Sequence, residues 1–344
     1  MMINIGGSST HPRVPRLLLC FGLILILALH TKSMARDTDV PCPAPTAPVV
    51  KIEAMPFYQA GDATNSQIDR EKLRENTRLT QPITRFLDTL GTLSDNYVQT
   101  RSADVKQCAD GFLYRWARAG ALKDISQGSQ AGFVQKWSLA SLGFLRMKLG
   151  PLRDSSQDAV VRNWMRDLAA SVANIYRGNG GPNRNNHYYW AMLALAVVGH
   201  STDDPTLWAR AEEMDRFALA DIQTDGTLPA ELKRIGRAAW YHAFAAEPLV
   251  LFKLVNERCR NQPHQNDERL NRLLEVVHDA LNGSPTLRTI TGIEQTAIQY
   301  RNWVNLWDAL EEGQPYIVTR ARERNLGGSV DVLYRFFLNG CHPG

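Results

Sequence analysis

The sequence predicts an all-α fold. From residue 83 onward, apolar residues recur at spacings of three and four, the period of helices that bury one face. The segments between these runs are short, and no segment shows the sustained two-residue alternation of a half-buried strand. Across the 344 residues, 44% are hydrophobic and 22% are charged, which argues against disorder, collagen-like repeats and a multi-span membrane protein.

Residues 1–35 are expected to form a secretory signal peptide. Arg13 and Arg16 precede an unbroken apolar run over residues 17–29, and Ala35 closes a Ser-Met-Ala sequence suited to cleavage. A transmembrane helix needs about 20 apolar residues, so this run favours a cleaved leader over a retained N-terminal anchor.

Removing the leader changes the charge. The leader holds three of the 39 basic residues and none of the 35 acidic ones, so the mature chain carries 36 against 35 and is nearly neutral. Binding of a polyanion would therefore depend on local clusters of cations rather than on net charge.

Four cysteines remain in the mature chain: Cys42, Cys108, Cys259 and Cys341. In an exported chain they allow two disulfides in three possible pairings, and we favour pairing within each half of the sequence. No CxxC or Cys/His cluster is present in the sequence, so no zinc site is expected.

The helices follow a proline-rich start. Segment 36–82 is expected to be loop-rich, because four prolines lie between residues 41 and 48 and the following polar stretch lacks periodicity. The expected helical runs, in order, are 83–98, 112–122, 133–149, 160–176, 188–198, 207–222, 238–255, 270–281 and 303–310. About ten or more helices in series fit an orthogonal bundle, a solenoid or an α/α toroid, and the lack of a fixed-period repeat disfavours the solenoid.

The first candidate site opens a helix after a glycine-rich turn. Asn186 and His187 stand where the unpaired N–H groups of a helix N-terminus attract anions, so they are candidates for binding a negatively charged ligand in a cleft. Trp190 lies three residues beyond His187 on the same face and could stack on a sugar. The alternatives are that Asn185 or Asn186 is an N-cap and that Trp190 packs in the core.

The second candidate site lies in residues 233–242. If a helix begins near Arg234, then Arg234, Arg237 and Tyr241 share one of its faces. A nearby guanidinium favours the phenolate form of a tyrosine, and such a tyrosine can both accept and return a proton. The alternative is a solvated basic face. No acidic pair of the glycoside hydrolase kind, nucleophile elbow, phosphate-binding glycine loop or HExxH motif stands out.

Together these motifs resemble the periplasmic alginate lyases of polysaccharide lyase family five. The resemblance runs along nearly the whole mature chain and includes PFYQAGD at 56–62, KQCADGFLYRWARAGAL at 106–122, QKWSLASLGFLRMKL at 135–149, NNHYYW at 185–190, DGTLPAELKRIGRAAWYH at 225–242 and NLGGSV at 325–330. It implies one incomplete α/α toroid over 36–344, a periplasmic location after cleavage near Ala35, a possible lid at 56–70, and no metal or other cofactor.

The resemblance also implies a role for each site residue. Asn186 and Arg234 would neutralise the carboxylate on C5 of a uronate. Tyr241 would protonate the leaving oxygen and, where the C5 proton and the leaving group are syn, also act as the base. His187 would be the base for the opposite C5 epimer. The implied substrate contacts are Tyr58, Gln130, Trp137, Trp190 and Arg237.

Two departures from the family pattern bear on specificity. Phe57 stands where the alginate-specific members have a lysine, and Phe133 stands where they have a tyrosine. The expected activity is a lyase for poly-β-D-mannuronate that extends to glucuronate-containing polymers. The alternatives are a broad polyuronate lyase acting on glucuronan or hyaluronan, a non-catalytic polysaccharide-binding scaffold, and a toroidal glycoside hydrolase. The expected partner is an anionic polysaccharide, with no nucleic acid or membrane partner after leader removal, and the expected oligomeric state is a monomer.

Overall fold

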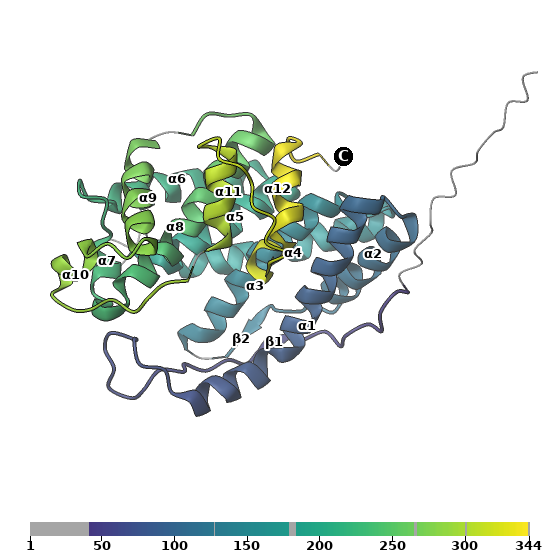
Figure 1. The fold of residues 1–344 in the computed structure, drawn as a ribbon. Helices are drawn as coiled ribbons and strands as arrows, with labels where there is room; N and C mark the ends of the chain where they lie inside the picture. Colours follow the sequence, from purple (N-terminus) through teal and green to yellow (C-terminus); the bar gives the residue numbers. More distant parts are fainter. Residues whose placement is uncertain (1–40, 127, 179–183, 265–266, 300, 343–344) are drawn as a thin grey trace, which may run out of the picture. The chain divides into compact units, whose positions relative to one another are not determined.

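A computed structural model describes residues 41–344 except 127, 179–183, 265–266, 300 and 343–344, so the leader expected at 1–35 lies outside the described residues. The described residues form twelve α-helices and four strands of two residues each, which confirms the all-α prediction (Figure 1). Strand β1 (Lys51–Ile52) pairs in parallel with β2 (Asp124–Ile125), and β3 (Arg322–Glu323) pairs antiparallel with β4 (Gly328–Ser329).

The helices are, in chain order, α1 (Arg70–Thr100), α2 (Ala103–Arg118), α3 (Ser129–Leu149), α4 (Ser155–Ile175), α5 (Asn186–Ser201), α6 (Pro205–Asp221), α7 (Pro229–Leu232), α8 (Ala238–Leu254), α9 (Asp267–Leu281), α10 (Thr286–Thr291), α11 (Asn302–Leu310) and α12 (Val330–Leu338). Two 3₁₀ turns, η2 (Ile235–Arg237) and η4 (Arg324–Leu326), and one π-helical turn, η3 (Val255–Cys259), complete the list.

Helix α1 begins earlier than the sequence predicted. The expected loop extended to residue 82, but α1 starts at Arg70 and contains Pro82. Asp69 caps it by accepting hydrogen bonds from the backbone N–H groups of Glu71 and Lys72. Most side chains of the first turns face solvent, so their polarity hid the helical period in the sequence.

The helices pack in two rows. Helices α1, α3, α5, α8 and α11 contact one another in that order, and α2, α4, α6 and α9 pack against them as a second row (Figure 1). Helix α5 is the most enclosed, because α3, α4, α6 and α8 all pack on it. Every residue from Tyr188 to Gly199 is buried, which explains why its sequence is apolar on all sides.

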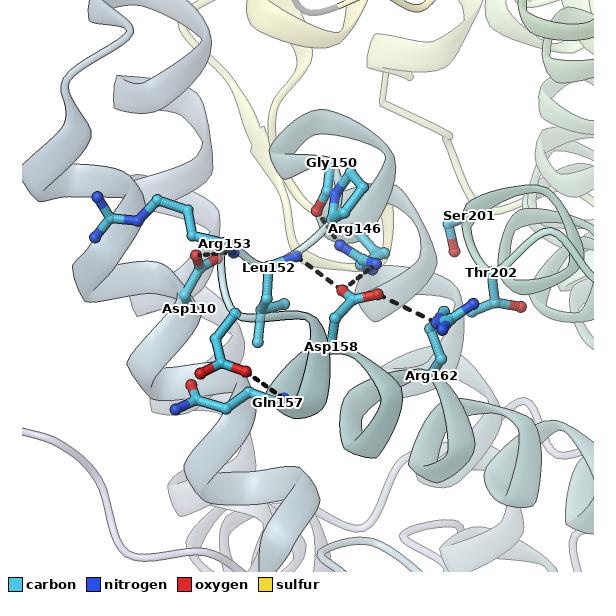
Figure 2. A network of polar contacts seen from close by, with 12 residues as sticks. Asp110, Arg146, Gly150, Leu152, Arg153, Gln157, Asp158, Arg162, Ser201 and Thr202 are labelled. Carbon is cyan, nitrogen blue, oxygen red and sulfur yellow. Dashed lines mark hydrogen bonds and ion pairs between the residues drawn. The ribbon is translucent and has the colours of Figure 1, made fainter.

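Buried ion pairs join the end of α3 to the start of α4 (Figure 2). Asp158 accepts hydrogen bonds from the guanidinium of Arg146 and from the backbone N–H of Leu152 at 2.7 Å, and it pairs with Arg162 at 3.1 Å. Removing one partner of such a buried pair is strongly destabilising, because the other charge is left uncompensated. This network therefore fixes the sharp connection between the two rows.

The four mature cysteines form two disulfides, Cys42–Cys108 and Cys259–Cys341, which confirms the pairing within each half of the chain. Within the described part of the chain, no helix is both long enough and apolar enough to cross a membrane.

Candidate active site

Four segments meet at the candidate site. They are the first turns of α3, the N-terminus of α5, the α7–η2–α8 corner, and residues 57–68, which we call the Tyr58 loop. The Tyr58 loop is closed at its base by an antiparallel bridge between Tyr58 and Ile68 and by a 2.9 Å bond from the N–H of Asp69 to the carbonyl of Phe57. These segments bring together side chains that lie more than 170 residues apart in the sequence.

Tyr241 lies in the first turn of α8 with only 5% of its surface exposed. Its hydroxyl oxygen is 3.0 Å from that of Tyr58, and it donates to the carbonyl of Asn65 at 3.4 Å. The predicted contact residue Tyr58 therefore does reach the predicted catalytic tyrosine. The Tyr58 loop covers the phenol on the side of its hydroxyl.

The electrostatics of Tyr241 correct the sequence expectation. Burial raises the pKa of Tyr241 above its ordinary value, and the hydrogen bond with Tyr58 raises it further. The cations Arg234 and Arg237 lower it by less. Their guanidinium carbons lie over the ring, 4.5 and 5.4 Å from its centroid, rather than at the oxygen. The two guanidiniums do favour the phenolate, as expected, but desolvation outweighs them, so the net pKa of Tyr241 is raised.

Arg234 lies before the N-terminus of α8, so the condition that a helix begins near Arg234 is not met. Helix α8 begins at Ala238, after a 3₁₀ turn in which Ile235 has a φ of +51°, a left-handed conformation that is rare for a β-branched residue. The turn still directs Arg234 over Tyr241, and its Nη1 donates to the carbonyl of Thr64 at 3.0 Å. Arg234 thus links the corner to the Tyr58 loop.

Asn186 is held by an acidic residue that the sequence analysis did not identify. Asn185 is the N-cap of α5, accepting from the N–H of His187 at 2.9 Å, so Asn186 is free of that role. The backbone N–H and the Nδ2 of Asn186 donate to Glu231 at 2.8 and 3.0 Å. Both residues are fully buried, and burial raises the pKa of Glu231. The Oδ1 of Asn186 is buried and has no hydrogen-bond partner among the described residues.

His187 stacks on Phe133 of α3, with centroids 3.6 Å apart and planes 11° apart. Its Nδ1 lies 2.7 Å from the Nζ of Lys136, which is fully buried. Burial lowers the pKa of His187 well below its usual value, and Lys136 and Arg234 lower it further. The imidazole is therefore neutral at physiological pH.

The remaining predicted contacts divide into two groups. The ring centroid of Trp137 lies 5.9 Å from that of His187, so Trp137 lies at this site, while Gln130 stands one helical turn before Phe133 and its role stays a prediction. Arg237 lies over Trp240 and Tyr241. Trp190, however, has no exposed surface and donates its Nε1–H to the carbonyl of Phe244 at 3.3 Å, so the alternative of core packing holds for it.

Sequence reasoning missed Glu231 and Lys136. Glu231 lies three residues before Arg234. An acidic residue in the first turn of a helix is common, so nothing in the sequence placed it at the site. Lys136 is one of three buried cations of α3, with Arg146 and Lys148, so its charge alone gave no signal that set it apart. Among the described residues, the group that could hold a metal ion is His278, Asp308 and Glu312, and it includes none of the site residues.

The two helical rows and this cluster place the protein among the polysaccharide lyases built as incomplete α/α toroids. A family model described as alginate lyase matches residues 31–286, so the chain belongs to the alginate lyase family.

Relatives agree with this assignment. A polysaccharide lyase of Stenotrophomonas maltophilia is 30% identical over 302 residues, covering 85% of this chain and 90% of the relative. An alginate lyase of Pseudomonas aeruginosa is 26% identical over 314 residues, covering 85% of each. Among solved structures, alginate lyase A1-III complexed with a tetrasaccharide has a TM-score of 0.71 at 20% identity, covering 85% of each chain, which shows a shared fold.

Proposed function

We propose that the protein cleaves poly-β-D-mannuronate, and glucuronate-containing polymers as well, by β-elimination without a metal ion. The observation that carries the proposal is the meeting at one site of Asn186 and His187 from the first turn of α5, Arg234 from the turn before η2, and Tyr241 from the first turn of α8. In this reaction a base removes the C5 proton, the C4–O bond breaks, and the leaving oxygen takes up a proton, leaving a double bond between C4 and C5.

The first requirement is to neutralise the carboxylate on C5. Removing the C5 proton places further negative charge on that group, so fixed donors and cations must stabilise it. One N–H of Arg234 donates to the carbonyl of Thr64, and the planar guanidinium has further N–H groups that can bind the substrate carboxylate. The Nδ2 of Asn186 contacts both oxygens of Glu231, so its donation to the substrate requires the amide to turn away from Glu231. Loss of one such donor costs about 10²–10³-fold in rate in comparable sites.

The second requirement is proton transfer. Tyr241 is placed to deliver a proton to the leaving oxygen, and in uronates where the C5 proton and the leaving group are syn, the same phenol can first act as the base. Mannuronate and glucuronate both have this arrangement. For the opposite C5 epimer the base must approach from the other face, and His187 fills that role only if its Nε2 carries no proton.

The Tyr58 loop is the proposed lid. It lies within the lid predicted at 56–70 and covers Tyr241 and Arg234 through Tyr58, Asn65 and Thr64. Polymer access to Tyr241 then requires the loop to move aside. Tyr58, Gln130, Trp137 and Arg237 remain the proposed substrate contacts, and Phe57 and Phe133 provide apolar surface in place of polar groups.

The proposed location is the periplasm, reached through the leader at 1–35. The two disulfides support a compartment in which thiols are oxidised. The proposed working form is a monomer with an anionic polysaccharide as its partner.

A substrate panel tests the function. Mature protein is incubated with polymannuronate, polyguluronate, glucuronan and hyaluronan, and the ultraviolet absorbance of the new conjugated double bond is followed. We expect a rise with polymannuronate, and its loss in Tyr241→Phe. The control Tyr334→Phe changes a half-buried tyrosine on α12 and should leave the rate unchanged.

No rise with any polymer would refute the enzyme function and leave the scaffold alternative. A rise that persists in Tyr241→Phe would refute the role of the phenol while leaving the activity established.

A further inference from the structure

Lys136 is a buried amine without an acidic partner. It lies in the second turn of α3 with no exposed surface, and none of its ion pairs or hydrogen bonds within the described residues involves a carboxylate. Its Nζ contacts two polar atoms, the hydroxyl of Tyr176 at 3.1 Å and the Nδ1 of His187 at 2.7 Å. Burying a lysine without a carboxylate partner costs free energy, so its retention at this position points to a role set by its neighbours.

Aromatic side chains hold both Lys136 and His187 in place. The Nζ of Lys136 lies 4.2 Å from the ring centroid of Phe133 and 5.0 Å from that of Trp137, where a positive charge is stabilised by the ring faces. The imidazole of His187 is clamped by its stack on Phe133. Only one ring nitrogen, Nδ1, contacts the lysine, and no described residue hydrogen-bonds Nε2.

We propose that Lys136 donates a hydrogen bond to the Nδ1 of His187 and thereby holds the imidazole as its Nε2–H tautomer, so that His187 offers a donor to the substrate instead of a base. A neutral imidazole has one donor and one acceptor nitrogen, and the partner of one nitrogen decides the state of the other.

The donation holds for either charge state of the lysine. An ammonium has three donors and no acceptor, so Nδ1 must accept. A neutral amine has two N–H groups, one of which donates to the hydroxyl of Tyr176 at 3.1 Å while the other remains for Nδ1. Burial raises the pKa of Tyr176, so its proton is retained. In both cases a hydrogen bond runs from Lys136 to His187.

The consequence concerns the direction of elimination and rests on the proposed function. An Nε2–H group beside Arg234 and Asn186 would add a third donor for the uronate carboxylate. With no base on the side of His187, both proton transfers fall to Tyr241, which permits only syn elimination. Polymers of the opposite C5 epimer, such as polyguluronate, should then resist cleavage.

The tautomer can be measured without any substrate. Proton–nitrogen correlation spectra of protein with labelled histidine distinguish a protonated from an unprotonated ring nitrogen, and His187→Gln assigns the signals. We expect His187 in the wild type to show an unprotonated Nδ1 and a protonated Nε2. A proton on Nδ1 would overturn the proposal, whatever the activity, and this measurement needs no variant that might fail to fold.

Two lysine variants separate this role from simple packing. Lys136→Met fills a similar volume but cannot donate, so we expect the tautomer preference to be lost and kcat on polymannuronate to fall by about tenfold or more with KM little changed. Lys148→Met removes another fully buried lysine of α3, about 18 Å along the helix, whose partner is Asp95. It should lower stability and leave the tautomer of His187 unchanged.

An unaltered tautomer in Lys136→Met, or an equal spectral change in both variants, would contradict the proposal. If no substrate of the panel is cleaved, the proposed function fails while the tautomer measurement still decides the role of Lys136.

Discussion

At the scale of single residues, the site depends on two side chains whose protonation is shifted by burial. The neutral form is favoured in both Tyr241 and His187, because each is largely removed from water. A neutral His187 can act as a fixed hydrogen-bond donor to the substrate. For Tyr241 it means that the phenolate needed to remove the C5 proton is a minor species, which the nearby cations Arg234 and Arg237 partly offset.

The pH dependence of the rate follows from the opposite pKa shifts of the two residues, since the pKa of Tyr241 is raised and that of His187 is lowered. If Tyr241 is the base, the fraction of phenolate rises with pH up to its raised pKa, so kcat/KM on polymannuronate should increase by roughly tenfold per pH unit through the neutral range. Initial rates from slightly acidic to moderately alkaline pH check this. A base with the lowered pKa of His187 would instead give a flat profile over the same range, and that result would contradict the assignment to Tyr241.

The same residues show where prediction from sequence stops. Asn186, His187, Arg234 and Tyr241 were found as helix-end and motif residues, and the structure brings them together. Lys136 and Glu231 were not found, and core packing of Trp190 was only one of two alternatives, because a helical period does not say what packs against it. Burial also reversed the expected direction of the Tyr241 pKa, which depends on the whole surrounding shell.

At the scale of elements, the Tyr58 loop is held in shape by one acidic side chain. Asp62 accepts hydrogen bonds from the backbone N–H groups of Thr64, Ser66 and Gln67 at 3.1, 2.7 and 2.7 Å. These bonds and that from the Thr64 hydroxyl, the largest cause, lower the pKa of Asp62 to about 2. The loop in turn places Thr64 and Tyr58 on the catalytic corner.

Replacing that carboxylate should loosen the loop without unfolding the protein. Asp62→Ala removes the acceptor for the turn, and we expect kcat/KM on polymannuronate to fall by about tenfold, because Tyr58 and Arg234 lose their fixed placement. The melting temperature should barely change, since Asp62 is only partly buried and its hydrogen bonds lie within the loop. Glu75→Ala, which removes an exposed carboxylate of α1, is the control. Equal rates in both variants would show that the loop shape does not matter.

Since the pKa of Asp62 is lowered, its contribution to the turn is present above the ordinary value of 3.8 and is lost as pH falls through about 2. The loop should therefore keep its shape at any pH used for assay.

The boundaries of the helices also show which features follow from the local sequence and which depend on tertiary packing. The order of the helices was predicted, because each has an apolar face with helical spacing. The start of α8 at Ala238 also agrees with the expected run over 238–255, but the start of α1 and the turn before α8 were not predicted. The first turns of α1 are polar on most sides, and α8 is preceded by a left-handed Ile235 that no local pattern indicates. The toroidal arrangement was indicated by resemblance to a family, since helical periods alone fit several architectures.

At the scale of the whole molecule, two disulfides connect distant parts of the chain, and residues 36–344 taken together are nearly neutral. Cys42–Cys108 spans 66 residues and Cys259–Cys341 spans 82. The second joins the π-helical turn after α8 to the segment after α12. Attraction of a polyanion must be local, and Arg234 and Arg237 beside the exposed Lys233 supply it at the site.

Removing the second disulfide should lower global stability. In the chain-entropy model a loop of this length contributes about 4 kcal/mol, and measured values for disulfides are commonly about 2–4 kcal/mol. We expect the double variant Cys259→Ser with Cys341→Ser to lose a free energy of unfolding within that range, measured by urea titration. An unchanged midpoint would mean that the disulfide does not constrain the unfolded chain.

The central claim is that this site cleaves a polyuronate by elimination. Cleavage of polymannuronate in water labelled with heavy oxygen, followed by mass spectrometry of the products, tests it most directly, because hydrolysis adds the oxygen of water and elimination does not. We predict products that carry an unsaturated uronate at the new non-reducing end and no heavy oxygen from bond cleavage. Products that incorporate heavy oxygen and lack the double bond would contradict the account.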